Sequence, residues 1–229
     1  MSEQGRVGPS DQPLRPVLVA TRNAGKLAEL RPMLRDAGYE PVDLGTAGIV
    51  ESADEAEVEC HPTFEENALA KARYFAHKAP GMAVLADDSG LAVDALGGAP
   101  GVHSRRWAML GGDSDAALAD ETAANNARLL RELRGVVDRG ARFVCAAAWV
   151  DQSGGGVEMV CRGEVEGSIL EERRGEGGFG YDPYFYCAEL GKGFGEASRE
   201  EKASVSHRAR AFAALIGAVS GAEGGRSVS

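Results

Sequence analysis

Two adjacent carboxylates stand between apolar residues in the middle of the chain. Asp87 and Asp88 are followed by Ser89 and Gly90 in the run Leu-Ala-Asp-Asp-Ser-Gly-Leu. Carboxylates beside apolar strand residues cost free energy unless they are paired, hydrogen-bonded or bound to a metal. Neighbouring residues of an extended segment point to opposite sides, so we expect one carboxylate to face a given ligand. A metal site made of one or two carboxylates and of substrate phosphate oxygens would suit Mg²⁺. The alternative is a local turn in which the Asp and Ser side chains bond to nearby backbone groups.

A polar segment between an expected strand and an expected helix is a candidate phosphate loop. Its residues are Thr21, Arg22, Asn23, Ala24, Gly25 and Lys26. Backbone N–H groups and the dipole at a helix N-terminus attract anions, and Lys26 adds a point charge. The spacing matches neither G-x-x-x-x-G-K-[ST] nor G-x-G-x-x-G. A plain strand-to-helix turn therefore remains the alternative.

A third candidate lies on the helix that the Thr63-Phe-Glu-Glu capping pattern predicts. Asn67 and Lys71 are four residues apart and share one face of that helix, and Glu59 precedes it in an acidic loop. Lys71 could neutralise a bound anion. An ordinary capped amphipathic helix with a solvated lysine explains the same residues.

Aromatic residues among glycines form the fourth candidate, in Phe179, Gly180, Tyr181 and Asp182. A flexible backbone that presents an aromatic ring offers a surface on which a purine base can stack. The alternative is a glycine-rich turn whose aromatic side chains fill the core.

The start of the last helix carries three basic residues, Lys202, His207 and Arg208. Cations near a helix N-terminus oppose the dipole, so an anionic ligand or a purine carbonyl would compensate for them. An exposed charged helix start is the alternative. Of the five lysines in the chain, Lys26, Lys71 and Lys202 fall in the candidate segments, and a compact ammonium suits a phosphate contact.

The elements expected to position these residues alternate between strand and helix. Apolar runs predict strands at 16–20, 83–86, 91–93, 143–150 and 157–165, and periodicity predicts helices at 26–37, 63–79 and 114–133. Ser198 and Ser206 are expected to cap a short helix and a last helix of about 13 residues, by capping preference. We therefore expect an α/β fold with a central sheet and helices on both sides, in one domain at 14–220 between mobile tails at 1–13 and 221–229.

Composition limits the possible functions. The chain has 229 residues, 44% hydrophobic and 26% charged, with a net charge of −10. This charge argues against a protein that coats nucleic acid or an anionic membrane, and no apolar run is long enough to span a bilayer. The four cysteines, which include Cys60 beside His61, form no C-x-x-C pair, so we expect free thiols in a reducing cytoplasm.

Six motifs, in this order along the chain, together resemble the inosine triphosphate pyrophosphatase family over about residues 17–216. They are Thr21-Arg-Asn-Ala-Gly-Lys26, Thr63-Phe-Glu-Glu-Asn67, Ala86-Asp-Asp-Ser-Gly-Leu91, Asp94-Ala-Leu-Gly-Gly-Ala-Pro-Gly101, Gly178-Phe-Gly-Tyr-Asp-Pro183, and Glu201-Lys202 with Ser206-His207-Arg208. The resemblance implies a curved mixed sheet with helices, in two lobes around a deep cleft, as a homodimer. It implies hydrolysis of ITP, dITP and XTP to the monophosphate and pyrophosphate, with water attacking the α-phosphorus and Mg²⁺ as cofactor.

The same resemblance implies roles for the candidate residues. Asp88 would accept a proton and bind the metal, with Glu59 as a metal ligand and Asp87 as a nearby carboxylate. Lys71 would neutralise phosphate charge. The remaining residues would hold the substrate: the 21–26 segment, Asn67, Ser89, Phe179, Gly180, Tyr181, Asp182, Lys202, His207 and Arg208. Donors from His207 and Arg208 would select a 6-oxo purine, because an adenine amino group would leave them unpaired.

Some positions depart from the family pattern. Arg22 stands where the family often has Gly, Cys60-His61-Pro62 replaces a Gly-containing turn, and Arg105 and Met109 alter a further motif. Two other functions stay open: a nucleotide-binding regulatory protein that has lost catalysis, and a hydrolase of ordinary dNTPs or damaged pyrimidine nucleotides.

Overall fold

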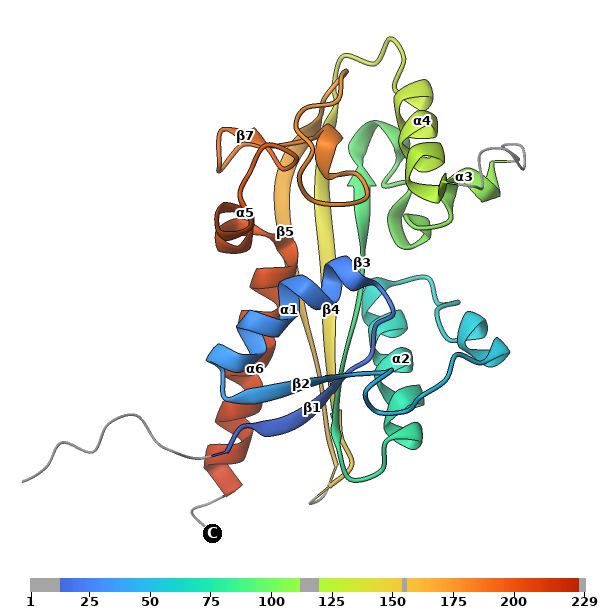
Figure 1. Ribbon diagram of the computed structural model, residues 1–229. Coiled ribbons are helices and arrows are strands. Elements are labelled where there is room, and N and C mark those ends of the chain that lie inside the picture. Colours follow the sequence, from blue (N-terminus) through green and yellow to red (C-terminus); the bar gives the residue numbers. More distant parts are fainter. Residues whose placement is uncertain (1–12, 112–119, 154–155, 227–229) are drawn as a thin grey trace, which may run out of the picture.

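A seven-stranded mixed sheet forms the centre of the molecule (Figure 1). The structure is a computed structural model and describes residues 13–111, 120–153 and 156–226. The strand order is β2-β1-β3-β4-β5-β6-β7. The strands are β1 (Arg15–Val19), β2 (Tyr39–Asp43), β3 (Ala83–Val93), β4 (Gly140–Asp151), β5 (Val157–Ile169), β6 (Phe185–Cys187) and β7 (Lys192–Gly193).

Helices cover both faces of this sheet, as expected for an α/β protein. They are α1 (Ala24–Asp36), α2 (Phe64–Lys78), α3 (Trp107–Leu110), α4 (Glu121–Glu132), α5 (Arg199–Val205) and α6 (His207–Arg226). Short 3₁₀ turns connect them, namely η1 (Ala53–Glu57), η2 (Asp94–Leu96), η3 (Gly101–His103) and η5 (Asp182–Tyr184). None of these helices, within the described ranges, is both long and apolar enough to cross a membrane.

Strand β3 corrects one expectation from the sequence. Residues 83–86 and 91–93 were expected to form two short strands around a polar turn, but they belong to one continuous strand. The carboxylates pair in register with β4, Asp87 opposite Ala147 and Asp88 opposite Ala146. This antiparallel ladder supplies the backbone hydrogen bonds that a turn would otherwise have to make, so the polar residues stay in an extended chain.

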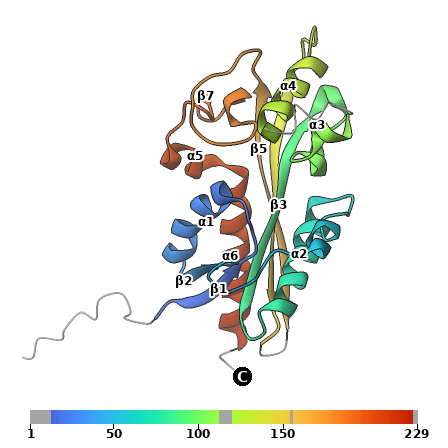
Figure 2. The ribbon, with the colours of Figure 1, turned by 45° about the vertical axis from the view of Figure 1, so that its right-hand side comes forward.

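The alternation of side chains along β3 separates two layers of core. Leu85 packs with α1 and α6, while Val84 and Ala86 pack with α2 on the other face. Figures 1 and 2 both show α2 on the opposite side of the sheet from α1 and α6. The two carboxylates that follow Ala86 therefore project to different layers, because the side-chain period of a strand is two.

A third core lies toward the other end of the long strands. It joins the end of β3 and the start of β4 to α3, α4 and β6, through residues such as Leu91, Phe143 and Phe185. Figure 2 shows α3, α4 and β7 grouped at this end, and α1, α2 and α6 grouped at the other. The long strands β3, β4 and β5 run through both groups, which form the two lobes that the resemblance implied.

Most helix boundaries follow the capping residues. Asn23, Thr63 and Ser198 accept backbone N–H groups at the starts of α1, α2 and α5, and α1 continues through Pro32. The last helix was expected to have about 13 residues but runs from His207 to Arg226, so it includes most of the segment 221–229 that was expected to be a tail.

The helix expected at 114–133 is described only from Glu121, where Asp120 caps α4. Its first part lies outside the described residues, as does nearly all of the N-terminal segment 1–13.

Candidate functional site

A cavity of about 870 Å³ lies between the two lobes and collects most of the candidate residues. The candidate residues that line it are Thr21, Arg22, Asn23, Lys26, Glu59, Lys71, Asp88, Ser89, Phe179, Gly180, Tyr181, Asp182, Lys202, His207 and Arg208. They come from five separate parts of the chain. The fold therefore brings together segments that the sequence only places in order.

Four candidates do not line this cavity. Ala24 and Gly25 open helix α1, Asn67 lies behind Asp88, and Asp87 lies on the other face of the sheet. The expectation that only one of the two carboxylates faces a ligand agrees with this arrangement. Asp88 lines the cavity. Asp87 forms ion pairs with Lys26 and Arg208, which also line the cavity.

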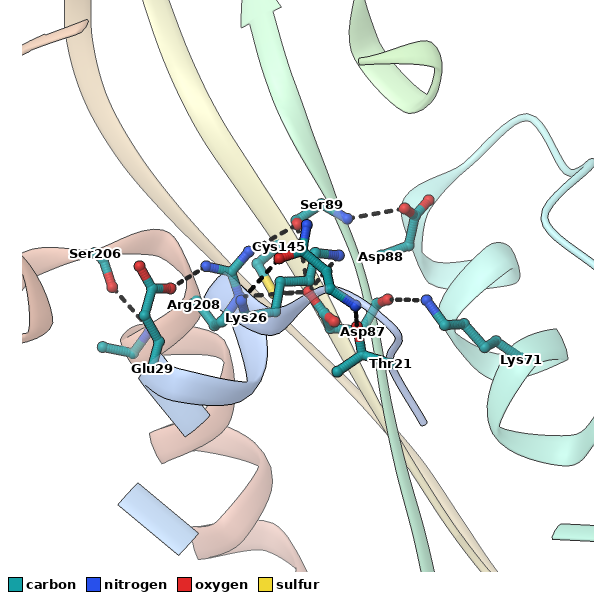
Figure 3. A network of polar contacts seen from close by, with 12 residues as sticks. Thr21, Lys26, Glu29, Lys71, Asp87, Asp88, Ser89, Cys145, Ser206 and Arg208 are labelled. Carbon is teal, nitrogen blue, oxygen red and sulfur yellow. Dashed lines mark hydrogen bonds and ion pairs between the residues drawn. The ribbon is translucent and has the colours of Figure 1, made fainter. Parts of the chain in front are cut away.

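Asp88 is a buried carboxylate on the α2 side of β3 (Figure 3). Its Oδ2 accepts a hydrogen bond from Asn67 Nδ2 at 3.0 Å, and its Oδ1 accepts one from the backbone N–H of Ser89 at 2.9 Å. Burial, with a further contribution from the nearby charge of Glu59, raises the pKa of Asp88 to about 6, against the opposing effect of Lys26 and Lys71. A carboxylate with such a pKa can accept a proton near neutral pH.

Asp87 has the opposite electrostatic character. Its Oδ2 is 2.9 Å from Lys26 Nζ and 3.4 Å from Arg208 Nε, and Ser89 Oγ donates to it at 3.3 Å. Burial alone would raise the pKa of Asp87, but the charges of Lys26 and Arg208 outweigh burial and hold it well below its usual range. Its Oδ1 is buried without a hydrogen-bond partner among the described residues. Asp87 therefore stays ionised and fixes two cations under the cavity.

Lys71 and Glu59 form an ion pair at the cavity wall. Lys71 Nζ donates to Glu59 Oε1 at 2.6 Å and to the backbone carbonyl of Asp87 at 2.9 Å. Burial opposes the charge of Lys71, yet Glu59 and Asp87 raise its pKa above the ordinary value. The ammonium is consequently charged and anchored to both the acidic loop and β3.

The segment 21–26 forms a compact strand-to-helix turn. Asn23 Oδ1 accepts the backbone N–H of Lys26 at 3.1 Å, and Thr21 Oγ1 accepts the backbone N–H of Asn23 at 3.2 Å. These bonds fix the backbone before α1 and direct the start of this helix toward the cavity. Such a helix N-terminus favours an anion.

Aromatic and cationic side chains form another part of the cavity wall. The ring centre of Phe179 is 4.8 Å from Lys202 Nζ and 5.6 Å from the guanidinium carbon of Arg208. Asp182 Oδ2 accepts the backbone N–H of Phe179 at 2.7 Å and is 2.6 Å from Lys202 Nζ. A Cβ on Gly178 would lie 2.2 Å from that carboxylate oxygen, so the glycine allows this close approach.

His207 is buried against the sheet at the start of α6. Its ring stacks on Phe143 with centres 4.9 Å apart and planes at 13°, and its Nδ1 has no hydrogen-bond partner among the described residues. Burial, reinforced by the charges of Arg208 and Lys202, lowers its pKa well below the ordinary value. His207 is therefore neutral and offers an unused polar atom beside the cavity.

Glu29 is a site residue that was not found in the sequence. It lies on α1, where Oε1 is 2.8 Å from Lys202 Nζ and Oε2 pairs with Arg208 Nη1. Glu29 follows Lys26 by three residues, so helical spacing could have placed both on one face. Arg105, Arg106 and Asn125 also line the cavity, without having been predicted as site residues.

Comparison with known proteins shows the family of the chain. Residues 17–218 match the sequence pattern of the Ham1 family. A dITP/XTP pyrophosphatase of Nocardia farcinica is 51% identical over 89% of this chain and 94% of that protein, and one of Ralstonia nicotianae is 45% identical over 89% and 96%. A HAM1 protein structure from Coxiella burnetii has a TM-score of 0.74, with 33% identity over 90% of this chain and 99% of that one. The chain belongs to the Ham1 family.

Proposed function

We propose that this chain is a nucleoside-triphosphate pyrophosphatase that hydrolyses dITP, ITP and XTP to the monophosphate and pyrophosphate. One observation carries the proposal: a single cavity is lined both by cationic and acidic groups, Lys26, Lys71 and Asp88, and by the rings of Phe179 and His207. This lining suits a ligand that carries both a polyphosphate and a purine. The relatives named dITP/XTP pyrophosphatase support the same substrates.

The donor set suits a divalent metal ion. Glu59 and Asp88 both line the cavity, and the charge of Glu59 contributes to the raised pKa of Asp88. A hard cation would relieve this repulsion between two carboxylates. The described residues hold no cluster of three His, Cys, Asp or Glu side chains suited to a metal. Mg²⁺ held by one or two carboxylates and by substrate oxygens fits such a site.

Asp88 is the proposed proton acceptor. Its carboxylate orients the attacking water and takes its proton, while Asn67 fixes the side chain from behind at 3.0 Å. Mg²⁺, when bound, acidifies that water and offsets phosphate charge. Lys71 and Lys26 stabilise the charge that spreads over the phosphate oxygens during attack at the α-phosphorus, and both ammonium groups are already held by carboxylates.

The proposed base recognition depends on fixed donors. Phe179 stacks on the purine, and donors of His207 and Arg208 address the 6-oxo group of hypoxanthine or xanthine. The buried guanidinium of Arg208 is held by Asp87, Glu29 and Ser89, so it cannot turn away from an unsuitable base without losing these bonds. An adenine amino group would leave buried donors unpaired, which costs about 1–3 kcal/mol each.

A comparison of kcat/KM for ITP, XTP, dITP, dUTP, ATP and GTP tests the assignment. We expect 6-oxo purine triphosphates without a 2-amino group to exceed ATP by at least about 100-fold, since a site built for a specific hydrogen bond rejects analogues strongly. Equal turnover of dUTP or ATP would overturn the substrate assignment. Failure of metal-dependent multiple turnover with every nucleotide would instead favour a regulatory binding protein.

Asp88→Asn tests the catalytic assignment. The variant keeps the hydrogen bond to Asn67 but cannot take a proton, so we expect loss of pyrophosphate release with folding intact. Near-normal turnover of dITP would contradict this role.

We further propose a homodimer and a cytoplasmic location, the latter supported by four cysteines that are all free. Sedimentation equilibrium tests the dimer.

A further inference from the structure

Arg22 of the phosphate loop is joined to Glu55 by a two-pronged ion pair. Arg22 Nε donates to Glu55 Oε2 at 2.8 Å, and Nη2 donates to Oε1 at 2.6 Å. The two side chains are 30% and 15% exposed, so water screens this pair less than an open surface pair. The pair thus uses both Nε and Nη2 of the guanidinium. A bidentate fork fixes direction as well as distance.

Glu55 belongs to an unusually acidic segment at the cavity wall. Residues 51–59 include five carboxylates and no basic residue. The last of them is Glu59, the proposed metal ligand. Repulsion within this segment would push it away from the cavity, especially when a triphosphate is bound. Cations from other elements must therefore hold it in place.

One side of the segment is attached to α2. Tyr74 Oη donates to Asp54 Oδ2 at 2.8 Å, Lys78 Nζ donates to Ser52 Oγ at 2.8 Å, and Lys71 holds Glu59. These contacts orient the segment relative to α2. None of these three contacts involves the phosphate loop.

The Arg22–Glu55 pair connects the segment to that loop. Glu55 Oε1 also accepts the backbone N–H of Ser52 at 3.3 Å, so the carboxylate that binds Arg22 also stabilises the first turn of η1. Thr21 and Asn23 fix the backbone on both sides of Arg22. The guanidinium therefore extends from a rigid loop to the acidic segment, whose Glu59 also has its backbone carbonyl bonded by Arg106 Nη2 at 3.4 Å.

We propose that Glu55 is a positioning residue that acts through Arg22 and holds Glu59 at a fixed place relative to the phosphate loop. The proposal rests on the proposed function, because it concerns how the metal carboxylate and the phosphate loop are aligned. We call the Arg22–Glu55 ion pair the latch, because it joins the segment 51–59 to the phosphate loop. In this role Arg22 is not a direct phosphate ligand. A simple phosphate-binding arginine would not need Glu55.

Hydrogen exchange of the metal-free, nucleotide-free protein tests the latch independently of activity. Arg22→Gln and Glu55→Gln should each increase exchange at residues 52–58 by about the same factor, and the double variant should increase it no further. Arg73→Gln breaks a similar fork with Glu158, at 3.0 and 2.5 Å, away from the cavity, and should leave this segment unchanged. Unchanged exchange in either single variant, or additive increases in the double variant, overturns the proposal.

Steady-state kinetics then separates the latch from direct phosphate binding. Both single variants should raise the Mg²⁺ concentration for half-maximal rate at least threefold. At saturating Mg²⁺, the KM for ITP should stay within twofold of the wild-type value. An increase in KM that is tenfold larger in Arg22→Gln than in Glu55→Gln would identify Arg22 as a phosphate ligand and overturn the latch. If wild-type protein hydrolyses no nucleotide, the proposed function fails while the exchange experiment still decides on the latch.

Discussion

Glu29 Oε1 accepts a hydrogen bond from Lys202 Nζ at 2.8 Å, although 173 residues separate the two in the chain. The other oxygen of Glu29 pairs with Arg208. Helix α1 starts at the phosphate loop with Lys26 and, one turn later, binds the two cations, which line the cavity. A single helix thus carries both the lysine of the phosphate loop and the carboxylate that holds Lys202 and Arg208.

Glu29→Gln should reduce stability moderately. Burial alone would raise the pKa of Glu29, but Arg208 and Lys202 lower it, so the carboxylate is charged and stabilises both cations. Each cation keeps a second partner, Lys202 with Asp182 and Arg208 with Asp87. We therefore expect a loss of about 1–2 kcal/mol in unfolding free energy, the scale of charge-assisted hydrogen bonds, with allowance for partial exposure.

Urea unfolding measures this loss, and Glu40→Gln is the matched control. Glu40 pairs with Arg35 at 2.9 Å on an exposed surface, so its substitution should leave the unfolding midpoint unchanged. Equal midpoints for the two variants would show that Glu29 does not stabilise the cation pair.

Gly25→Ala should impair substrate binding although alanine favours helices. A Cβ at this position would lie 2.9 Å from Phe179 Cδ1 and 3.1 Å from Asn23 Oδ1, so the ring or the cap must move. We expect kcat/KM for ITP to fall by about 10- to 100-fold, the effect of a displacement near 1 Å in a positioned site.

The control for this variant is Gly217→Ala on α6, where a Cβ would meet open space. Helix propensity predicts that Gly217→Ala stabilises the protein by about 0.5–1 kcal/mol with no change in kcat/KM. In a Phe179→Ala background, the effect of Gly25→Ala should largely disappear. If its full effect persists there, the clash with the ring is not the cause.

The local features of the site could be predicted because they depend on neighbouring residues. Asn23, Thr63 and Ser198 cap their helices as their residue types indicate. The placement of Asp87 and Asp88 on opposite sides follows from the strand period alone. Six motifs in order were then enough to indicate a nucleotide site.

Contacts between distant segments could not be predicted in this way. Nothing in the spacing relates Glu29 to Lys202 or Arg22 to Glu55, because these pairs depend on how α1 and η1 pack on the sheet. The expected interruption of the strand at 87–90 was wrong for a similar reason. Strand β4 pairs along the whole of β3, and tertiary pairing decides the conformation of a polar segment whose local sequence is ambiguous.

His207 should remain neutral across the working pH range. Burial and the charges of Arg208 and Lys202 lower its pKa well below the ordinary value, so protons bind the unfolded chain more readily than the folded one as the pH falls through about 6.5. Wild-type unfolding free energy should therefore decrease between pH 7 and 5 by more than that of His207→Gln.

Two measurements check this prediction. Denaturant unfolding of both proteins from pH 8 to 5 gives the difference in slope, and the NMR signal of His207 Cε1 should stay constant over the same range. A His207 signal that titrates with a midpoint near 6.5 would contradict a neutral, buried imidazole.

Asp88 should show the opposite pH dependence in metal-free protein. Burial and Glu59 raise its pKa to about 6, above the value of about 3.9 for an unfolded chain. The folded state then holds the proton more strongly, so the stabilising contribution is complete below about pH 4 and is lost as the pH rises through 6. Asp88→Asn carries no such charge and should be more stable than wild type at pH 7, by up to about 3 kcal/mol for a shift of two units.

Unfolding with EDTA at pH 4, 6 and 7.5 measures the difference between the two proteins, which should increase with pH. Mg²⁺ should reverse the order at pH 7.5, because the cation offsets the charge of the wild-type carboxylate and stabilises only the protein that binds it. Asn67→Ala is the matched comparison: it removes the 3.0 Å hydrogen bond that lowers the pKa of Asp88 but leaves the charge, so its stability should still fall as the pH rises, and the fall should extend to a higher pH than in wild type. A difference between Asp88→Asn and wild type that does not vary with pH would mean that Asp88 is already ionised without cost in the empty site, and its burial would then have no part in preparing it to accept a proton.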